Sequence, residues 1–194
     1  MNFINSFLNE SKFIIENIDK KKVDSLISEI YYLKKRKGRL FFLGVGGSAA
    51  NCSHAVNDFR KICGIESYAI TDNVSELTAR TNDEGWKTIF SKWLETSKLN
   101  KKDAIFILSV GGGNISKNVS VNLIEAIKFA KLKKSKIFGI TGKKIGYTQK
   151  NADKCIVIPV LNNEFLTPQS ESFQSVILHL IVSHPKIKSF STKW

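Results

Sequence analysis

The chain has 194 residues, of which 42% are hydrophobic and 24% charged, and this size and composition are typical of a single globular domain spanning residues 1–194. No stretch approaches the roughly 18 apolar residues of a membrane span, and the N-terminus lacks the basic start and long apolar core of a secretory signal, so we expect neither membrane insertion nor secretion. The net charge of +13 permits nucleic-acid binding, but the lysines gather in short runs without interleaved aromatic residues, so we expect small anionic ligands and no nucleic-acid partner.

Amphipathic periodicity predicts two helices at the start of the chain, over residues 2–17 and 22–36. Beyond residue 38, short apolar runs alternate with amphipathic segments. The expected strands are residues 39–44, 67–71, 104–109, 136–141 and 154–159. The expected helices are residues 48–63, 74–80, 86–97, 119–133 and 169–183.

Strands that alternate with helices of this length indicate an α/β fold with a parallel sheet covered on both faces. We expect a pair of leading helices (1–37), an α/β core (38–184) and a tail (185–194). The three cysteines form neither a CxxC pair nor a disulfide pattern, so the expected location is a reducing cytoplasm.

A glycine-rich turn follows the first predicted strand. The run Gly44-Val-Gly-Gly-Ser48 joins that strand to a helix that carries His54 and Asp58 four residues apart, and therefore on one face. The free N–H groups and the dipole of a helix N-terminus attract anions. The segment predicts a phosphate at one end of a pocket and proton or metal chemistry at the other.

A second glycine loop follows the strand at 104–109. Ser109 ends that strand, Gly111 to Gly113 come next, and Ser120 stands where the following helix begins. Exposed amides and small hydroxyl residues can cradle a phosphate, and ligands of open α/β sheets bind at the carboxyl ends of the strands. We interpret the two loops as opposite walls of one pocket. The alternative is that the second loop is merely flexible.

Only three histidines are present. His184, in Ser-His-Pro, is typical of the end of a helix, and a lone histidine on an apolar helix is more often a core residue than a ligand. However, His54 and His179 each have a carboxylate on the same predicted helix, namely Asp58 and Glu171. Two such pairs favour a catalytic or metal-binding role.

The first turn also fits a dinucleotide-binding motif. Residues 44–49 satisfy G-x-G-x-x-A, and Asp72 ends the next strand near the position of a ribose-binding carboxylate. A dinucleotide fold normally begins with that strand, whereas two predicted helices precede it here. The motif also leaves the Ser109 loop and both histidines unexplained, so we favour the phosphate-pocket interpretation.

Together these motifs resemble the sugar-isomerase (SIS) fold and, within it, the sedoheptulose 7-phosphate isomerases, also called phosphoheptose isomerases. The resemblance extends to about His184 and rests on the first glycine turn combined with His54 and His179. It implies a five-stranded parallel sheet in a flavodoxin-like three-layer α/β/α sandwich. It also implies a homotetramer with active sites at subunit interfaces and, in several members, a bound zinc ion.

The resemblance assigns substrate-binding residues position by position. The family's Asn-Gly-Gly loop and the serine after it are matched by Val45, Gly46, Gly47 and Ser48. An Asn-Asp pair in the pocket is matched by Asn82 and Asp83. The phosphate loop usually written Ser-Thr-Ser-Gly-Asn-Ser is matched by Ser109, Val110, Gly111 and, as its last hydroxyl, Ser120.

The resemblance also assigns the metal ligands and the catalytic pair. His54 matches a metal-binding histidine, and Asp58 falls where the family has a glutamate that is both metal ligand and catalytic base. Glu171 matches a glutamine that binds metal and substrate, and His179 matches the catalytic histidine, which we include in the metal site. Two imidazoles and two carboxylates suit a borderline ion such as zinc.

Four departures from the family pattern affect substrate choice more than reaction type. Val45 lacks an amide side chain, and Val110 and Gly111 replace hydroxyl residues in a lengthened loop. Asp58 is one methylene shorter than glutamate, which changes its reach. Glu171 in place of glutamine makes the predicted metal site more negative.

The implied reaction is the aldose–ketose isomerisation between D-sedoheptulose 7-phosphate and D-glycero-D-manno-heptose 7-phosphate, the first step towards nucleotide-linked heptoses for surface glycans. A proton moves between C1 and C2 through an enediolate, with Asp58 as the base and His179 as the acid. Two alternatives stay open: an isomerase of another sugar phosphate, and a non-catalytic relative that binds the bacterial replication initiator. Retention of His54 and His179 counts against the second.

The N-terminal helix carries more apolar side chains than one contact face needs. They are Phe3, Ile4, Phe7, Leu8, Phe13, Ile14 and Ile15. Surplus apolar surface on a helix usually marks a partner. Together with the resemblance, this predicts a homotetramer whose activity falls on dilution or on deletion of residues 1–17.

Overall fold

The computed structural model describes residues 2–192, so the last two residues of the predicted tail lie outside the described part. Five parallel strands form one sheet in the order β2-β1-β3-β4-β5. The strands are β1 (Leu40–Leu43), β2 (Ser67–Ala69), β3 (Ala104–Ser109), β4 (Lys136–Thr141) and β5 (Lys154–Val157). The predicted α/β fold with a five-stranded parallel sheet is confirmed.

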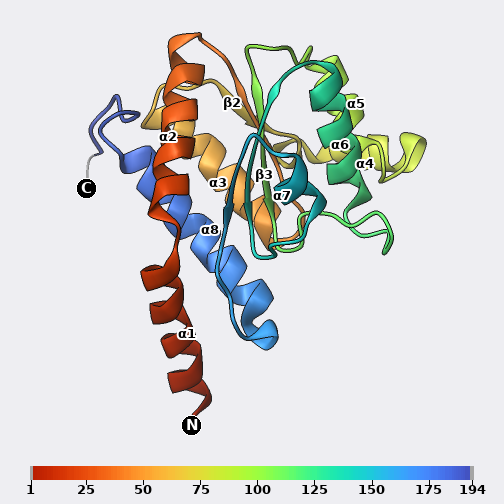
Figure 1. Ribbon diagram of the computed structural model, residues 1–194. Coiled ribbons are helices and arrows are strands. Elements are labelled where there is room, and N and C mark those ends of the chain that lie inside the picture. Colours follow the sequence, from red (N-terminus) through yellow and green to blue (C-terminus); the bar gives the residue numbers. More distant parts are fainter. Residues whose placement is uncertain (1, 193–194) are drawn as a thin grey trace.

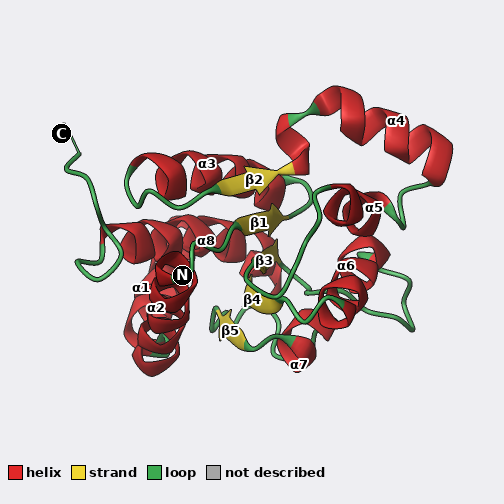
Figure 2. Ribbon diagram, turned by 90° about the horizontal axis from the view of Figure 1, so that it is seen from above, coloured by secondary structure: helices red, strands yellow, loops and turns green. Residues whose placement is uncertain are grey.

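Helices cover both faces of the sheet, as Figure 2 shows from above. One side is covered by α2 (Lys20–Lys35), α3 (Gly47–Lys61) and α8 (Leu166–Ser183), and α1 (Phe3–Asn17) leads into α2 on that side. The other side is covered by α4 (Val74–Glu84), α5 (Ile89–Thr96), α6 (Val121–Leu132) and α7 (Tyr147–Asn151). The N-terminal helix α1 extends beyond the body of the chain (Figure 1).

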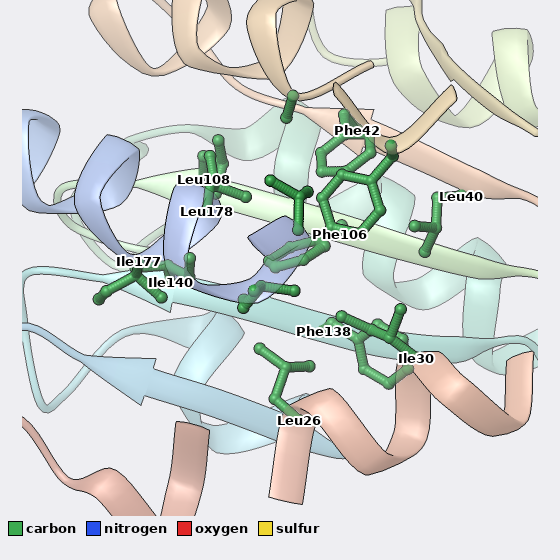
Figure 3. Packing of buried hydrophobic residues seen from close by; sticks show 14 of the residues in the cluster. Leu26, Ile30, Leu40, Phe42, Phe106, Leu108, Phe138, Ile140, Ile177 and Leu178 are labelled. Atoms are coloured by element: carbon green, nitrogen blue, oxygen red, sulfur yellow. The ribbon is translucent and has the colours of Figure 1, made fainter. Parts of the chain in front are cut away.

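A row of phenylalanines ties the strands to the helices on the α2, α3 and α8 side. Phe42, Phe106 and Phe138 stand at matched positions on β1, β3 and β4, so their side chains share one face of the sheet. The rings of Phe42 and Phe106 stack with centroids 5.2 Å apart, and all three side chains are at most 1% exposed. Figure 3 shows Leu26 of α2 and Leu178 of α8 packed with the same cluster. This core fixes α8, which carries His179, against the sheet.

The structure differs from the predicted elements at their edges. The short helix α7 was not predicted, because Tyr147–Asn151 is too brief to display a helical period. Helix α4 runs to Glu84 instead of residue 80, and Gly85 ends it with a positive φ of 83°. No described helix combines the length and apolar character needed to cross a membrane. None of these differences moves the loops that follow β1 and β3.

Candidate functional site

Helices α3 and α8 lie side by side and run in the same direction. The contacts between them follow the residue numbers of both helices upward: Ser48 pairs with Gln174 and His54 with His179, and Cys63, just past the end of α3, pairs with Val182. His54 and His179 are 125 residues apart in the chain, yet their Nε2 atoms are 2.8 Å apart. The parallel packing of two apolar helix faces therefore brings together the histidines that the sequence singled out.

Asp58 completes this cluster from the next turn of α3. Its Oδ2 atom lies 3.3 Å from His54 Nε2 and 3.6 Å from His179 Nε2. The Asp58 side chain is 12% exposed, whereas those of His54 and His179 are 51% and 55% exposed. The carboxylate is thus sheltered, while both imidazoles face solvent. Because the two imidazole nitrogens are at hydrogen-bond distance, one must donate an N–H to the other when no ion separates them.

Asn57 orients the carboxylate and was missed by the sequence interpretation. Its Nδ2 donates to Asp58 Oδ1 at 3.0 Å, which leaves Oδ2 directed at the imidazoles. The sequence gives no reason to single out Asn57, because an asparagine on a helix is usually a solvated surface residue. In the folded chain, one oxygen of Asp58 is held and the other is available for chemistry.

The cluster lies in the wall of a cavity of about 720 Å³. Its lining consists of His54, Asn57, Asp58, Lys61, Ile62, His179, Ser191 and Thr192. The spacing of His54, Asp58 and Lys61 along α3 places them on one face, so helical periodicity could have predicted Lys61 as a residue of this site. Ser191 and Thr192 could not be predicted from periodicity, because only the fold brings the C-terminal segment to the end of α3. There, Ser189 and Phe190 donate backbone N–H groups to Ile62 O.

The donor set fits a zinc ion. The ligand atoms of His54, Asp58 and His179 all lie within 4.8 Å of one another. A tetrahedral zinc site with bonds of about 2.0–2.2 Å separates its ligand atoms by roughly 3.3–3.6 Å, which the two distances to Asp58 match. The 2.8 Å between the imidazoles is shorter and would open slightly around an ion. Glu171 is not part of this group.

The first glycine turn leads into α3 as predicted, and the polar groups of Ser48 already have partners. Gly46 has φ of 63° and is the N-cap of α3, so the turn needs a glycine there. Ser48 is 2% exposed, and its Oγ accepts a hydrogen bond from Gln174 Nε2. Its N–H donates to Glu171 Oε1. Val45 is 41% exposed beside the turn.

The second loop is tightly folded. Ser109 ends β3, is 8% exposed, and accepts a hydrogen bond from the Gly112 N–H at its Oγ. Backbone bonds to Val110 O from residues 142 and 143 hold the loop beside β4. Gly111 follows Val110, and Ser120, with φ of 50°, is the N-cap residue of α6. A hollow of about 340 Å³ adjoins this loop and is lined in part by Ser116 and Lys150, which sequence reasoning did not single out.

Asn82 and Asp83 lie apart from the histidine cluster within this chain. Both are exposed on α4, and Asn82 Nδ2 donates to Asp83 Oδ1. Helix α4 lies on the side of the sheet opposite α8 (Figure 2), and neither residue lines the 720 Å³ cavity. In this chain their side chains pair with each other.

The cysteines are not suited to thiolate chemistry. Burial raises the pKa of the Cys63 and Cys155 thiols to about 11 each, and burial together with the charge of Asp72 raises that of Cys52 well above its ordinary value. A thiol with so high a pKa stays protonated near neutral pH and is a poor nucleophile and metal ligand. The site chemistry therefore rests on imidazole and carboxylate groups.

Comparisons with known proteins agree with the fold. No family model matches the chain. The phosphoheptose isomerase of Rhodospirillum rubrum is 30% identical over 149 residues, covering 74% of this chain and 73% of that protein. That of Cytophaga hutchinsonii is 31% identical over 166 residues, covering 79% and 82%. The solved phosphoheptose isomerase from Neisseria gonorrhoeae superimposes with a TM-score of 0.78 over 92% of both chains at 20% identity.

Proposed function

The chain belongs to the phosphoheptose isomerase family, and we propose that it interconverts sedoheptulose 7-phosphate and D-glycero-D-manno-heptose 7-phosphate. The observation that carries this proposal is the approach of Asp58 Oδ2 to His179 Nε2, at 3.6 Å, in the wall of the 720 Å³ cavity. An aldose–ketose isomerase needs a base and an acid that act on adjacent carbons and oxygens of an open-chain sugar. The Asp58 and His179 pair supplies both.

The proposed proton transfers balance within the site. Asp58 Oδ2 takes the proton from C1 of the ketose as the C1–H bond breaks, and the electrons form the C1–C2 double bond of an enediolate. The same carboxylate then returns the proton to C2. His179 passes the hydroxyl proton from O1 to O2. While no ion lies between the rings, His54 holds the Nε2 atom of His179 by the 2.8 Å hydrogen bond. With an ion bound at Nε2, Nδ1 would be the ring nitrogen that carries the proton. Asn57 fixes the base through Asp58 Oδ1.

We further propose that the functional enzyme holds one zinc ion per subunit through His54, Asp58 and His179. The close approach of their donor atoms supports this set. When bound, the ion would supply Lewis acidity that stabilises the charge developing on the sugar oxygens. Because Asp58 Oδ1 accepts a hydrogen bond from Asn57, the metal-ligand role and the base role both fall on Oδ2, whose two lone pairs would serve the ion and the sugar proton.

A panel of sugar phosphates tests the proposed substrate. The enzyme is incubated with sedoheptulose 7-phosphate, a pentulose 5-phosphate and an amino sugar 6-phosphate, and the products are identified by NMR. We expect turnover of the heptulose to the aldoheptose phosphate, and much slower turnover of the others. Preferred turnover of a shorter or amino sugar would assign the enzyme to another substrate of the same reaction class. No turnover, with binding of the replication initiator, would support the non-catalytic alternative.

We also propose a homotetramer assembled through α1. Four large apolar side chains of this helix, Phe3, Ile4, Leu8 and Ile15, are between 53% and 69% exposed. Ile4, Leu8 and Ile15 follow a helical spacing and form one stripe. The half-exposed imidazoles of His54 and His179 leave room for a neighbouring subunit to close the pocket.

Charged residues in this stripe are expected to break the assembly. The double variant Leu8→Glu and Ile15→Glu should elute as smaller species and lose activity per subunit, because it places carboxylates in an apolar contact. Light scattering and activity at several dilutions measure both effects. Asn5→Glu, about 100° round the helix from Ile4, is the control. An active wild-type monomer near the 21.8 kDa chain mass would overturn the tetramer.

A further inference from the structure

Glu171 occupies the position at the start of α3 where an anion would bind. The Ser48 N–H donates to Glu171 Oε1 at 3.1 Å. A Cβ atom at residue 47 would overlap the carboxylate of Glu171 as it lies here, so a larger residue would force that carboxylate to move. The carboxylate of α8 therefore presses directly on the first turn of α3.

A polar network holds Glu171 in this place. Asn51 Nδ2 donates to the Glu171 backbone oxygen at 2.9 Å and to Gln174 Oε1 at 3.0 Å. Ser175 Oγ donates to Asn51 Oδ1, and Gln174 Nε2 donates to Ser48 Oγ. These bonds join α8 to the first two turns of α3. The position of Glu171 is thus fixed by the packing of the two helices.

The charge at this position decides which ligands the turn accepts. The N-terminus of a helix carries a partial positive charge that attracts anions, and a carboxylate in contact with it neutralises that charge. A second anion at the same turn meets repulsion from Glu171. The glutamine of the family pattern has the same shape but no charge, so it would leave the turn attractive to phosphate.

We propose that Glu171 is a specificity-determining residue that closes the first glycine turn to phosphate. The phosphate end of the substrate is then left to the second loop, between Ser109 and Ser120. The inference rests on the proposed isomerisation only for the identity of the substrate. The closure of the turn itself depends on the contact of Glu171 with Ser48 and Gly47. The zinc site proposed above uses His54, Asp58 and His179 and does not require Glu171.

Titration with inorganic phosphate, followed through the backbone amide signals of Gly47 and Ser48, tests the closure without any turnover. In the wild-type protein we expect no saturable shift of these two signals, while amides of the second loop respond. In Glu171→Gln the two signals should shift saturably. Phosphate should also inhibit sugar-phosphate turnover at least about fivefold more strongly, since two unit charges about 4 Å apart repel appreciably even in water-like surroundings.

The matched control is Glu164→Gln, which removes the same charge from an exposed residue just before α8. It should behave as the wild type, because the effect depends on the contact and not on net charge. A saturable shift of the Ser48 signal in the wild-type protein would overturn the proposal, whatever the variant does. Equal phosphate binding by wild type and Glu171→Gln would overturn it as well. Neither result depends on whether the heptulose is the substrate.

Discussion

Replacing Asp58 by asparagine is expected to lower kcat for the proposed isomerisation by about 10²–10⁴-fold, the range that a positioned general base contributes. Asparagine keeps the shape of the side chain and can still pair with Asn57, which now donates to Asp58 Oδ1. What it loses is the ability to take a proton at the atom that faces His54 and His179. The variant should fold normally, because the carboxylate lies at the edge of the cavity and not in the apolar core.

Steady-state kinetics measure the loss of kcat, and a melting curve shows whether the variant is still folded. Asp24→Asn, the same substitution at an exposed site on α2, is the matched control and should leave both unchanged. Asp58→Glu introduces the residue of the family pattern, which keeps a carboxylate base on a side chain one methylene longer. It should therefore keep more activity than Asp58→Asn. If Asp58→Asn turned over at the wild-type rate, Asp58 could not be the base.

Loss of His179 is expected to have the second large effect, because this residue is proposed both to hold zinc and to move the hydroxyl proton. His179→Gln should lose bound zinc and about 10²–10⁴-fold in kcat. His54→Gln should lose zinc to a similar degree, since it removes one of three donors. It keeps the proposed acid, however, so its kcat should fall less.

Zinc per subunit, measured by elemental analysis, and kcat for the same preparations test this difference. His184→Gln is the control, because His184 lies past the end of α8, where its Nδ1 accepts from the Lys186 N–H. Full zinc content in both His54→Gln and His179→Gln would remove these residues from the metal site. Wild-type turnover of His179→Gln would remove it from the reaction.

The parts of the fold that local patterns determine could be predicted from the sequence. The buried strands are apolar runs, such as Leu40–Leu43, and their alternation with helices implies a parallel sheet. The four-residue spacing of His54 and Asp58 is sufficient to predict that they share one face of a helix. Both inferences use short-range periodicity, which the backbone obeys regardless of context.

The parts of the site that depend on tertiary contacts could not be read in this way. The 2.8 Å approach of His54 to His179 joins residues 125 positions apart, and only the family resemblance pointed to it. Ser191 and Thr192 reach the cavity because the C-terminal segment bonds to Ile62 O, which no local pattern records. The contact of the Glu171 carboxylate with the Ser48 N–H, in the first turn of α3, likewise depends on the packing of α8 against α3. In each case helix packing decides where a side chain lies.

Isomerisation in deuterium oxide tests the proposed chemistry most directly. Asp58 is 12% exposed and opens on a cavity, so a proton that it takes from C1 has the opportunity to exchange with solvent before it returns to C2. We therefore expect wild-type enzyme to convert sedoheptulose 7-phosphate into aldoheptose 7-phosphate that carries deuterium at C2, detected by NMR. The contrary result is product with only protium at C2 and no deuterium at C1 of the remaining ketose. It would indicate a hydride shift and contradict catalysis by Asp58 through an enediolate.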